Sequence, residues 1–335
     1  MDDERIVSSE VLVGRDSELA SLSRLVKEVA AGRGGTVLVE GEPGIGKSSL
    51  VRAALAEAAD LGCQMFWGTG DELGRELPLQ PLIDGLRVRE SSENPRRNTI
   101  VRLLRGEVTT DLGMDGPTVL AEQMLALIAE QCATRPTILV IDDLQWADQA
   151  TIRLWVRLAK AARHMRLLLI GMMRPVPKRD DLLALRRSVA DAARIRLAAL
   201  TQGPTTELVA TLVGGKPGDD LMHLADGAAG NPLYITELVA ALIRSSMVVV
   251  ADTGVATVTA GTVPDSLSAA IVDRLSFVGQ PVRETLRAAA LLGVDFAVSD
   301  LGTVLGLSAS SLVPTVDEAR AAGVLTESSK GLSFR

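Results

Sequence analysis

The sequence predicts an α/β protein whose first 200 residues build a parallel five-stranded sheet covered by helices. Two observations lead to this prediction: apolar runs of strand length recur along this part of the chain, and segments with helical periodicity separate them. Helices between successive strands imply right-handed crossovers, and such connections give parallel sheets that are buried on both faces. The predicted strands are 34–41, 63–70, 137–143, 166–173 and 194–200.

The helices expected around this sheet rest on spacing and on stop signals. Residues 16–31 place Leu19, Leu22, Val26 and Val29 on one stripe, and Gly32 follows as a stop. Further helices are expected over 47–59 and 118–133. A charged stretch containing Pro and Asn, residues 88–99, is expected to be a loop.

The pattern changes after Leu200, which predicts further domains. Short helices punctuated by glycine fill residues 201–247, and residues 248–263 resemble a β-hairpin. Helices resume at Pro264 and are followed by a predicted strand, and we expect this last domain to be truncated at its C-terminal end. The predicted domains are therefore a nucleotide-binding domain over 1–200, a helical lid with a terminal hairpin over 201–263, and a third domain over 264–335.

Composition limits the class of protein. The 335 residues are 47% hydrophobic, which is enough for two or three domains with real cores. The formal net charge is −7, with 35 basic and 42 acidic residues. Proteins that wrap nucleic acid need clustered Lys and Arg to neutralise phosphates, so we do not expect this chain itself to bind DNA.

The sequence also predicts a cytoplasmic location without a membrane partner. The acidic N-terminal residues lack the apolar core of a signal peptide, and the longest apolar run, 167–173, is too short to span a bilayer. Cys63 and Cys132 lie far apart in apolar surroundings, as in proteins of reducing compartments.

The segment Gly41–Ser48 carries the strongest chemical signal. It reads GEPGIGKS and fits G-x-x-x-x-G-K-[ST], between a predicted strand and a predicted helix. Glycines at such positions let backbone N–H groups approach phosphate, and the helix N-terminus adds its positive dipole end. We expect Lys47 to bridge the β- and γ-phosphates and Ser48 to bind Mg²⁺. The loop residues expected to contact the nucleotide are Pro43, Gly44, Ile45, Gly46, Lys47, Ser48 and Ser49.

Two adjacent carboxylates, Asp142 and Asp143, follow the third predicted strand. Ligands of open parallel sheets bind at the carboxyl ends of the strands, so this pair is expected beside the phosphate loop. Asp142 would complete the Mg²⁺ shell, and Asp143 would act as general base toward the attacking water. Taken alone, a strand that ends in a polar turn would explain the pair equally well.

Arg174 ends the fourth predicted strand. A cation at this edge can neutralise charge on the γ-phosphate, although a surface arginine before a proline turn is the plain alternative. In the segment that follows Asp143, Asp148 is expected to be a helix N-cap and Trp146 to be a packing residue.

Six motifs in a fixed order give the sequence a family resemblance. They are VLVGRDSEL, GEPGIGKSSL, ILVIDDLQWAD, LLLIGMMRP, GNPLYITELV and VPDSLSAAIVDRL. The chain resembles the N-terminal ATPase module of the large ATP-binding regulators of the LuxR family, within the STAND branch of AAA-related P-loop NTPases. The resemblance covers essentially the whole chain.

This resemblance implies more than spacing does. Val13, Gly14 and Arg15 would line the adenine pocket, and Pro232 would reach it from the lid. Residues 264–335 would form a winged-helix domain that packs on the nucleotide site. The ligands would be ATP or ADP with Mg²⁺, hydrolysis would be slow and regulatory, and the ATP state would self-associate. DNA would be bound only by a C-terminal region outside these residues.

Two other functions stay open at this stage. A mechanically working AAA-type ATPase, such as a remodeller or loader, would form a ring, and no arginine stands out by spacing as its trans-acting finger. A small-molecule phosphotransferase would need an acceptor pocket, and Asp142-Asp143 together with the GNP segment argue against it. A nucleotide switch that controls oligomerisation is the function that the sequence favours.

Overall fold

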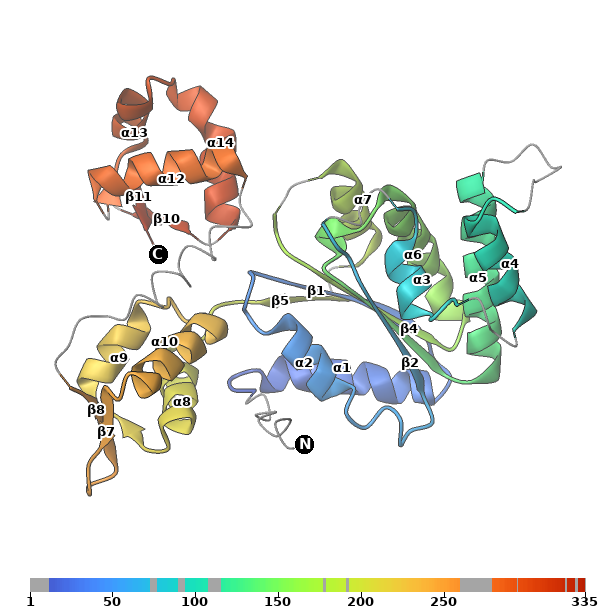
Figure 1. Ribbon diagram of the computed structural model, residues 1–335, viewed down its shortest axis with the longest axis horizontal. Helices are drawn as coiled ribbons and strands as arrows, with labels where there is room; N and C mark the ends of the chain where they lie inside the picture. Colours follow the sequence, from blue (N-terminus) through green and yellow to red (C-terminus); the bar gives the residue numbers. More distant parts are fainter. Residues whose placement is uncertain are drawn as a thin grey trace.

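Three bodies follow one another along the chain in the computed structural model (Figure 1). They are an α/β core, a small helical unit and a C-terminal unit of helices and short strands. The structure describes residues 12–72, 77–89, 94–107, 116–176, 179–190, 193–259, 279–293, 295–322, 324–328 and 331–334. The boundaries 1–200, 201–263 and 264–335 stay predictions.

The core contains the expected five-stranded sheet. Its strands are β1 (Gly35–Gly41), β2 (Gln64–Thr69), β3 (Thr137–Asp142), β4 (Leu167–Met173) and β5 (Arg194–Leu197). Their order is β2-β3-β4-β1-β5, and every neighbouring pair is parallel. The prediction of a parallel five-stranded α/β core is therefore confirmed, and its strands lie within the ranges predicted from sequence. The parallel arrangement brings the carboxyl ends of β1, β3 and β4 to one edge, which positions the site.

Helices cover both faces of this sheet (Figure 1). α1 (Asp16–Ala30) and α2 (Lys47–Ala54) pack on one face, where Val140 points. On the other face, Leu139 packs among the helices whose bounds are α3 (Gln80–Gly85), α5 (Gly116–Thr134), α6 (Gln149–Ala161) and α7 (Asp180–Ser188). Successive strand residues point to opposite faces, so an apolar run such as 138–141 fills both cores.

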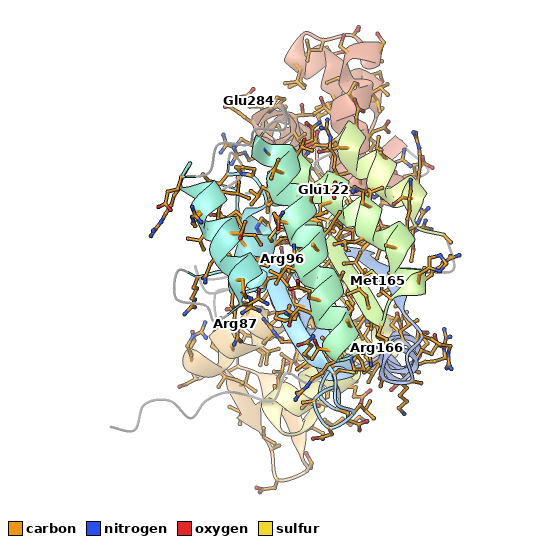
Figure 2. The ribbon with its side chains drawn as sticks, turned by 90° about the vertical axis from the view of Figure 1, so that its right-hand side faces the viewer. Arg87, Arg96, Glu122, Met165, Arg166 and Glu284 are labelled. Atoms are coloured by element: carbon orange, nitrogen blue, oxygen red, sulfur yellow. The ribbon has the colours of Figure 1, made fainter. Side chains whose placement is uncertain are left out.

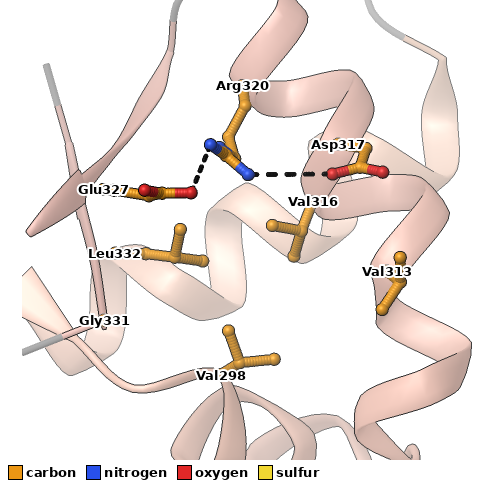
Figure 3. A pocket seen from close by; sticks show the side chains of 8 residues that line it. All are labelled: Val298, Val313, Val316, Asp317, Arg320, Glu327, Gly331 and Leu332. Carbon is orange, nitrogen blue, oxygen red and sulfur yellow. Dashed lines mark hydrogen bonds and ion pairs between the residues drawn. The ribbon is translucent and has the colours of Figure 1, made fainter.

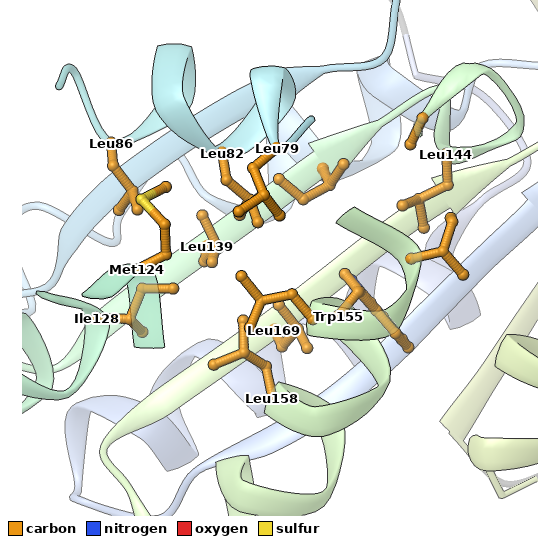
Figure 4. Close-up of a cluster of buried hydrophobic side chains, with 14 of the residues drawn as sticks. Leu79, Leu82, Leu86, Met124, Ile128, Leu139, Leu144, Trp155, Leu158 and Leu169 are labelled. Carbon is orange, nitrogen blue, oxygen red and sulfur yellow. The ribbon is translucent and has the colours of Figure 1, made fainter. Parts of the chain in front are cut away.

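The larger of these cores is dense in leucine (Figure 4). Trp155 and Leu158 of α6 approach Leu169 of β4, while Met124 and Ile128 of α5 approach α3. Few aromatic residues are needed, because branched aliphatic side chains interdigitate well between a sheet and its helices.

One predicted loop contains a helix. α4 (Pro95–Leu104) begins inside the stretch 88–99 and packs beside α5. Asn94 caps it, since its Oδ1 accepts hydrogen bonds from two backbone N–H groups, and Pro95 occupies the first helical position. Pro and Asn were therefore a helix start rather than a loop signal. Figure 2 looks onto this pair of helices, with Arg96 and Glu122 labelled on them.

The second unit is mainly helical, as expected. It comprises α8 (Gln202–Val213), β6 (Lys216–Pro217), α9 (Asp219–Asp226), α10 (Pro232–Arg244), β7 (Val248–Val250) and β8 (Val255–Val258). β7 and β8 pair antiparallel, which confirms the hairpin within the described residues. β6 adds a parallel partner that the sequence did not predict. Its core is a separate apolar cluster that includes Val209, Ile235 and Val239.

The C-terminal unit contains helices packed on a small sheet. Its elements are α12 (Gln280–Leu292), β9 (Asp295–Phe296), α13 (Val298–Leu305), α14 (Ala309–Ala321), β10 (Leu325–Ser328) and β11 (Gly331–Phe334). The sheet order is β10-β11-β9, and both pairs are antiparallel. The winged-helix assignment stays a prediction, and the first helix expected after Pro264, within residues 264–275, lies outside the described residues. Arg320 pairs with Asp317 and Glu327 beside a pocket of this unit (Figure 3).

Three short helical turns complete the core. They are η1 (Leu144–Trp146), which follows β3, η2 (Ala162–His164), which precedes β4, and the turns over 55–62, which follow α2. The helix predicted over 47–59 is therefore shorter than expected, although Leu55 and Ala58 still pack in the core. None of the helices in the described part of the chain is long and apolar enough to cross a membrane.

Candidate nucleotide-binding site

The glycine loop joins β1 to α2 at the carboxyl edge of the sheet. Gly44 and Gly46 have φ of +72° and +96°, a region that glycine adopts without strain. Gly46 is the N-cap of α2, so the N-terminus of that helix opens directly on the loop. Ile45 is buried beneath the loop, and Ser49 lies half-buried in the first turn of α2. The loop therefore has the geometry of a phosphate-binding nest.

Lys47 is the cation of this loop. Its side chain is buried, and Nζ donates hydrogen bonds to the carbonyl oxygens of Gly41 and Glu42 at 3.0 and 2.9 Å. The pKa of Lys47 is lowered to about 8: burial is the main cause, the nearby Arg174 cation acts in the same direction, and neighbouring carboxylates oppose both. A phosphate group at the loop would favour the charged form of this lysine.

Ser48 and Asp142 lie together, although 94 residues separate them. Ser48 Oγ donates a hydrogen bond to Asp142 Oδ2 at 2.8 Å, and burial raises the pKa of Asp142. Mg²⁺ prefers hard oxygen ligands and takes one or two from protein, with substrate phosphates and water supplying the rest. This hydroxyl–carboxylate pair fits that ion. No group of three or more His, Cys, Asp or Glu side chains suited to a metal occurs among the described residues.

Asp143, Gln145 and Arg174 form a second polar group at the same edge. Asp143 Oδ1 accepts a hydrogen bond from Gln145 Nε2 at 2.7 Å and lies 3.5 Å from Arg174 Nε. Gln145 Oε1 accepts a hydrogen bond from the backbone N–H of Arg174 at 3.0 Å. The structure thus brings together the two charged side chains that sequence placed at the ends of separate strands.

Two arginines of the segment after β4 brace this edge. Arg186 Nε lies 2.5 Å from Glu40 Oε1, and its Nη2 donates a hydrogen bond to the carbonyl oxygen of Arg174. Arg179 donates from Nη1 to the carbonyl oxygens of Gln145 and of the nearby Ala147. Arg186 thus holds the backbone at Arg174, just after β4, and Arg179 holds the turn after β3 that carries Gln145.

The helical unit contacts the glycine loop directly. Asn231 Nδ2 donates a hydrogen bond to the carbonyl oxygen of Pro43 at 2.9 Å. The backbone N–H of Leu233 donates a hydrogen bond to the carbonyl oxygen of Gly44 at 3.2 Å. A Cβ at Gly44 would lie 2.7 Å from Leu233 Cβ, so only glycine permits this approach. Pro232 is the first residue of α10, between the two donors.

The Val13–Arg15 segment lies against the same unit. Val13 belongs to the apolar cluster of the helical unit, and a Cβ at Gly14 would lie 2.6 Å from Pro204. Arg15 is buried, and its Nη2 donates a hydrogen bond to the carbonyl oxygen of Ala198 at 2.5 Å. Burial lowers the pKa of Arg15. The adenine pocket expected from these residues and Pro232 stays a prediction.

Sequence reasoning missed Gln145 and the donor role of Asn231. In the sequence, Gln145 is marked only by its position two residues after Asp143, and its full burial is visible only in the structure. The family resemblance singles out Pro232 of the GNP segment, whereas the hydrogen bond to the glycine loop comes from its neighbour Asn231. The expectation that Asp148 caps a helix is confirmed, because its Oδ1 accepts a hydrogen bond from the N–H of Thr151.

The fold and the loop define a P-loop nucleotide-binding domain of the α/β class. Residues 11–170 match the family model described as AAA ATPase domain, so this part of the chain forms an AAA-type P-loop ATPase domain. The family match indicates nucleotide binding and hydrolysis.

One curated protein is similar in sequence. It is the uncharacterised protein R02095 of Rhizobium meliloti (strain 1021), 25% identical over 261 residues that cover 68% of this chain and 24% of that protein. The chain thus spans about a quarter of the length of the curated relative that it matches.

Three solved structures are similar to this chain at low sequence identity. The ORC1 protein of Aeropyrum pernix, solved in complex with DNA, is 15% identical with a TM-score of 0.48, covering 97% of this chain and 90% of that one. The RuvB Holliday junction branch migration motor of Thermotoga maritima is 14% identical with a TM-score of 0.46 and coverages of 96% and 92%. A STAND protein of Pyrococcus horikoshii with a tetratricopeptide repeat sensor is 14% identical with a TM-score of 0.41 and coverages of 97% and 41%.

Proposed function

We propose that this chain is the ATP- and ADP-binding, slowly hydrolysing switch module of a LuxR-family transcriptional regulator. In this proposal, ADP holds the helical unit and the C-terminal unit against the ATPase core. Exchange for ATP releases them, so that the protein self-associates and activates a DNA-binding region elsewhere in the regulator.

The contact between α10 and the glycine loop carries the proposal. Asn231 and the N–H of Leu233 bond to two successive carbonyl oxygens of the loop, at Pro43 and Gly44. Any rearrangement of these peptides around a phosphate chain changes both hydrogen bonds. The position of the helical unit and the occupancy of the loop are thus linked through shared atoms.

The C-terminal unit supports the same proposal. Val176, two residues after Arg174, is 1% exposed and belongs to the apolar cluster that forms the core of this unit. A pocket at the carboxyl edge of the sheet is lined by Glu42 of the glycine loop and also by Ala321 of α14. The segment that carries Arg174 therefore contacts both the candidate site and the C-terminal unit.

The free energy available from nucleotide binding is comparable to that of the contacts between the units, as a switch requires. A nucleotide that binds two conformations equally shifts nothing, so the two nucleotides must differ in their affinity for the closed form. A ligand at about a thousandfold above its Kd can bias such an equilibrium by about 4 kcal/mol. Two hydrogen bonds and one buried valine are worth roughly that amount in total.

The proposed chemistry assigns a role to each side chain of the site. Lys47 holds the β- and γ-phosphates, and Ser48 and Asp142 bind Mg²⁺, which neutralises phosphate charge when it is bound. Asp143 accepts the proton of the attacking water, and Arg174 stabilises charge that develops on the γ-phosphate. Lys47→Ala is accordingly expected to weaken nucleotide binding.

Small-angle scattering tests the switch. The protein is measured with saturating ADP and with a non-hydrolysable ATP analogue, at several protein concentrations. The proposal predicts a larger radius of gyration, or a larger particle, with the analogue. Identical profiles at all concentrations would contradict it. A closed ring with turnover of many ATP per second would instead favour a mechanically working AAA-type ATPase.

A further inference from the structure

We infer that Gln145 is the positioning residue for the candidate catalytic base: its carboxamide ties the carboxylate of Asp143 to the backbone of β4 at Arg174. This inference rests on the proposed ATPase activity and on the proposed role of Asp143. Gln145 follows Asp143 by two residues in the short turn η1.

The hydrogen-bonding capacity of the two neighbours explains the residue type. A backbone N–H can only donate, and an ionised carboxylate can only accept. The side chain between them must therefore accept on one side and donate on the other. Gln145 does both, with Oε1 toward the N–H of Arg174 at 3.0 Å and Nε2 toward Asp143 Oδ1 at 2.7 Å. A glutamate in its place could not donate to Asp143 while ionised.

Burial makes the link rigid. Gln145 has 0% of its surface exposed, and its own carbonyl oxygen accepts a hydrogen bond from Arg179 at 2.9 Å. Asp143 itself has φ of +49°, a region that a non-glycine residue occupies only when its surroundings hold it there. Both the backbone and the side chain of Asp143 are thus fixed.

One carboxylate oxygen of Asp143 stays available to accept a proton from the attacking water. Oδ1 of Asp143 is engaged by Gln145 and lies beside Arg174, whereas Oδ2 accepts no hydrogen bond from any residue in the described ranges. A carboxylate pinned through one oxygen presents the other in a single orientation toward a water. Among the described residues, the hydrogen bonds of Gln145 go to Asp143, Arg174 and Arg179 and not to the glycine loop or Ser48, so we expect it to act on hydrolysis rather than on nucleotide binding.

The test compares two variants that break the link in different ways. Q145E keeps an acceptor for the N–H of Arg174 and, at a pH where the glutamate is ionised, removes the donor to Asp143, while Q145M keeps the volume and removes both bonds. Each is expected to lower kcat for ATP hydrolysis by about tenfold to a hundredfold, and to leave the Kd for ADP within about threefold. Thermal unfolding checks that each variant is folded.

Gln64 provides the matched control. Gln64 lies at the start of β2, and its carboxamide also bridges two elements. Its Nε2 donates hydrogen bonds to the carbonyl oxygen of Gln131 in α5 and to Thr137 Oγ1 in β3. Q64M is expected to leave kcat unchanged. If Q145E and Q145M behave like Q64M while D143N abolishes hydrolysis, the role of Gln145 is wrong and the proposed activity survives.

A double variant separates the remaining cases. If Gln145 acts through Asp143, then Q145M adds less than about twofold to the kcat loss of D143N, because the base is already absent. Independent, additive losses would overturn the inference. If D143N hydrolyses ATP at the normal rate, both the base and its positioning residue are refuted, and the proposed chemistry fails with them.

Discussion

Asn231 and Pro43 are joined by a hydrogen bond of 2.9 Å across 188 residues of sequence, from the side-chain amide of a helix cap to a carbonyl of the glycine loop. The same asparagine also caps its own helix, since its Oδ1 accepts from the N–H of Leu233, which this oxygen shares with the carbonyl oxygen of Gly44. One side chain thus starts α10 and holds it on the candidate phosphate site. Loss of the cap and loss of the contact can be separated, because serine caps helices about as well as asparagine but is too short to reach Pro43.

The substitution N231S is expected to speed the release of ADP. Removal of one partly buried hydrogen bond between the helical unit and the loop costs about 1 kcal/mol, which corresponds to roughly a fivefold faster dissociation. The rate can be measured by displacement of a fluorescent ADP. N94S is the matched control, because Asn94 also caps a helix with Pro at its first position but lies at α4. Equal rates for N231S and the native protein would refute the contact's role.

Nucleotide affinity is expected to fall above pH 8. The pKa of Lys47 is lowered to about 8, so the lysine loses its proton above that pH, while phosphates favour the protonated form. Affinity should drop by up to tenfold for each further pH unit, and binding at pH 8 should take up a fraction of a proton. Calorimetry in buffers of different ionisation enthalpy measures both. In K47R, whose guanidinium stays charged, proton uptake from this position should vanish.

The effect of Lys47 on protein stability should change with pH in the opposite direction to its effect on nucleotide affinity. The pKa of Lys47 is lower in the folded protein than the ordinary 10.5, so between pH 8 and 10.5 the unfolded chain binds more protons. The contribution of Lys47 to the free energy of unfolding therefore rises with pH across this window. K47M, which removes the buried cation, should be more stable than the native protein at pH 7, and the difference should shrink by pH 10. Urea unfolding of both proteins at pH 7 and pH 10 measures this difference. A stability difference that stays constant between the two pH values would contradict the lowered pKa of Lys47.

The substitution D143N is expected to separate hydrolysis from binding. Asparagine tolerates positive φ and can keep the backbone at +49°, but it cannot accept a proton as a base. We expect kcat to fall by about a hundredfold or more and the Kd for ADP to change by less than about threefold. Single-turnover hydrolysis measures the first and titration the second. D84N, at an exposed position of α3, should change neither.

The substitution V176S is expected to loosen the C-terminal unit. Burial of this valine contributes about 1.5 to 3 kcal/mol, and serine would place a hydroxyl in an apolar cluster. The ADP-bound protein should then scatter as a larger particle, with the fold of the core unchanged. V313S, at a position of α14 that is 53% exposed, is the control. An unchanged profile for V176S would show that the contact does not hold the unit.

The sheet and the glycine loop could be predicted because their signals are local. An apolar run such as 138–141 has the composition of a strand buried on both faces, and GEPGIGKS requires its conformation through the residues themselves. The edge where Asp142 meets Ser48 also followed, since parallel strands place their carboxyl ends together.

Contacts between distant segments could not be predicted in the same way. Asn231 and Pro43 lie in separate units, and nothing in either segment specifies the other. Gln145 is an uncharged residue in a turn, so its burial between Asp143 and the end of β4 became visible only in three dimensions. The start of α4 falls inside the stretch 88–99, which the sequence predicts to be a loop because Pro and Asn favour turns and helix starts equally.

Hydrogen exchange at the first turn of α10 tests most directly whether the nucleotide controls the helical unit. The amide of Leu233, which donates to Gly44, is followed with saturating ADP and with a non-hydrolysable ATP analogue. The amides of Arg96 and Arg97, capped by Asn94, give an internal reference in the same molecule. We predict at least tenfold faster exchange at Leu233 with the analogue than with ADP, and no change at the reference amides. Equal exchange at Leu233 in both states would contradict the switch.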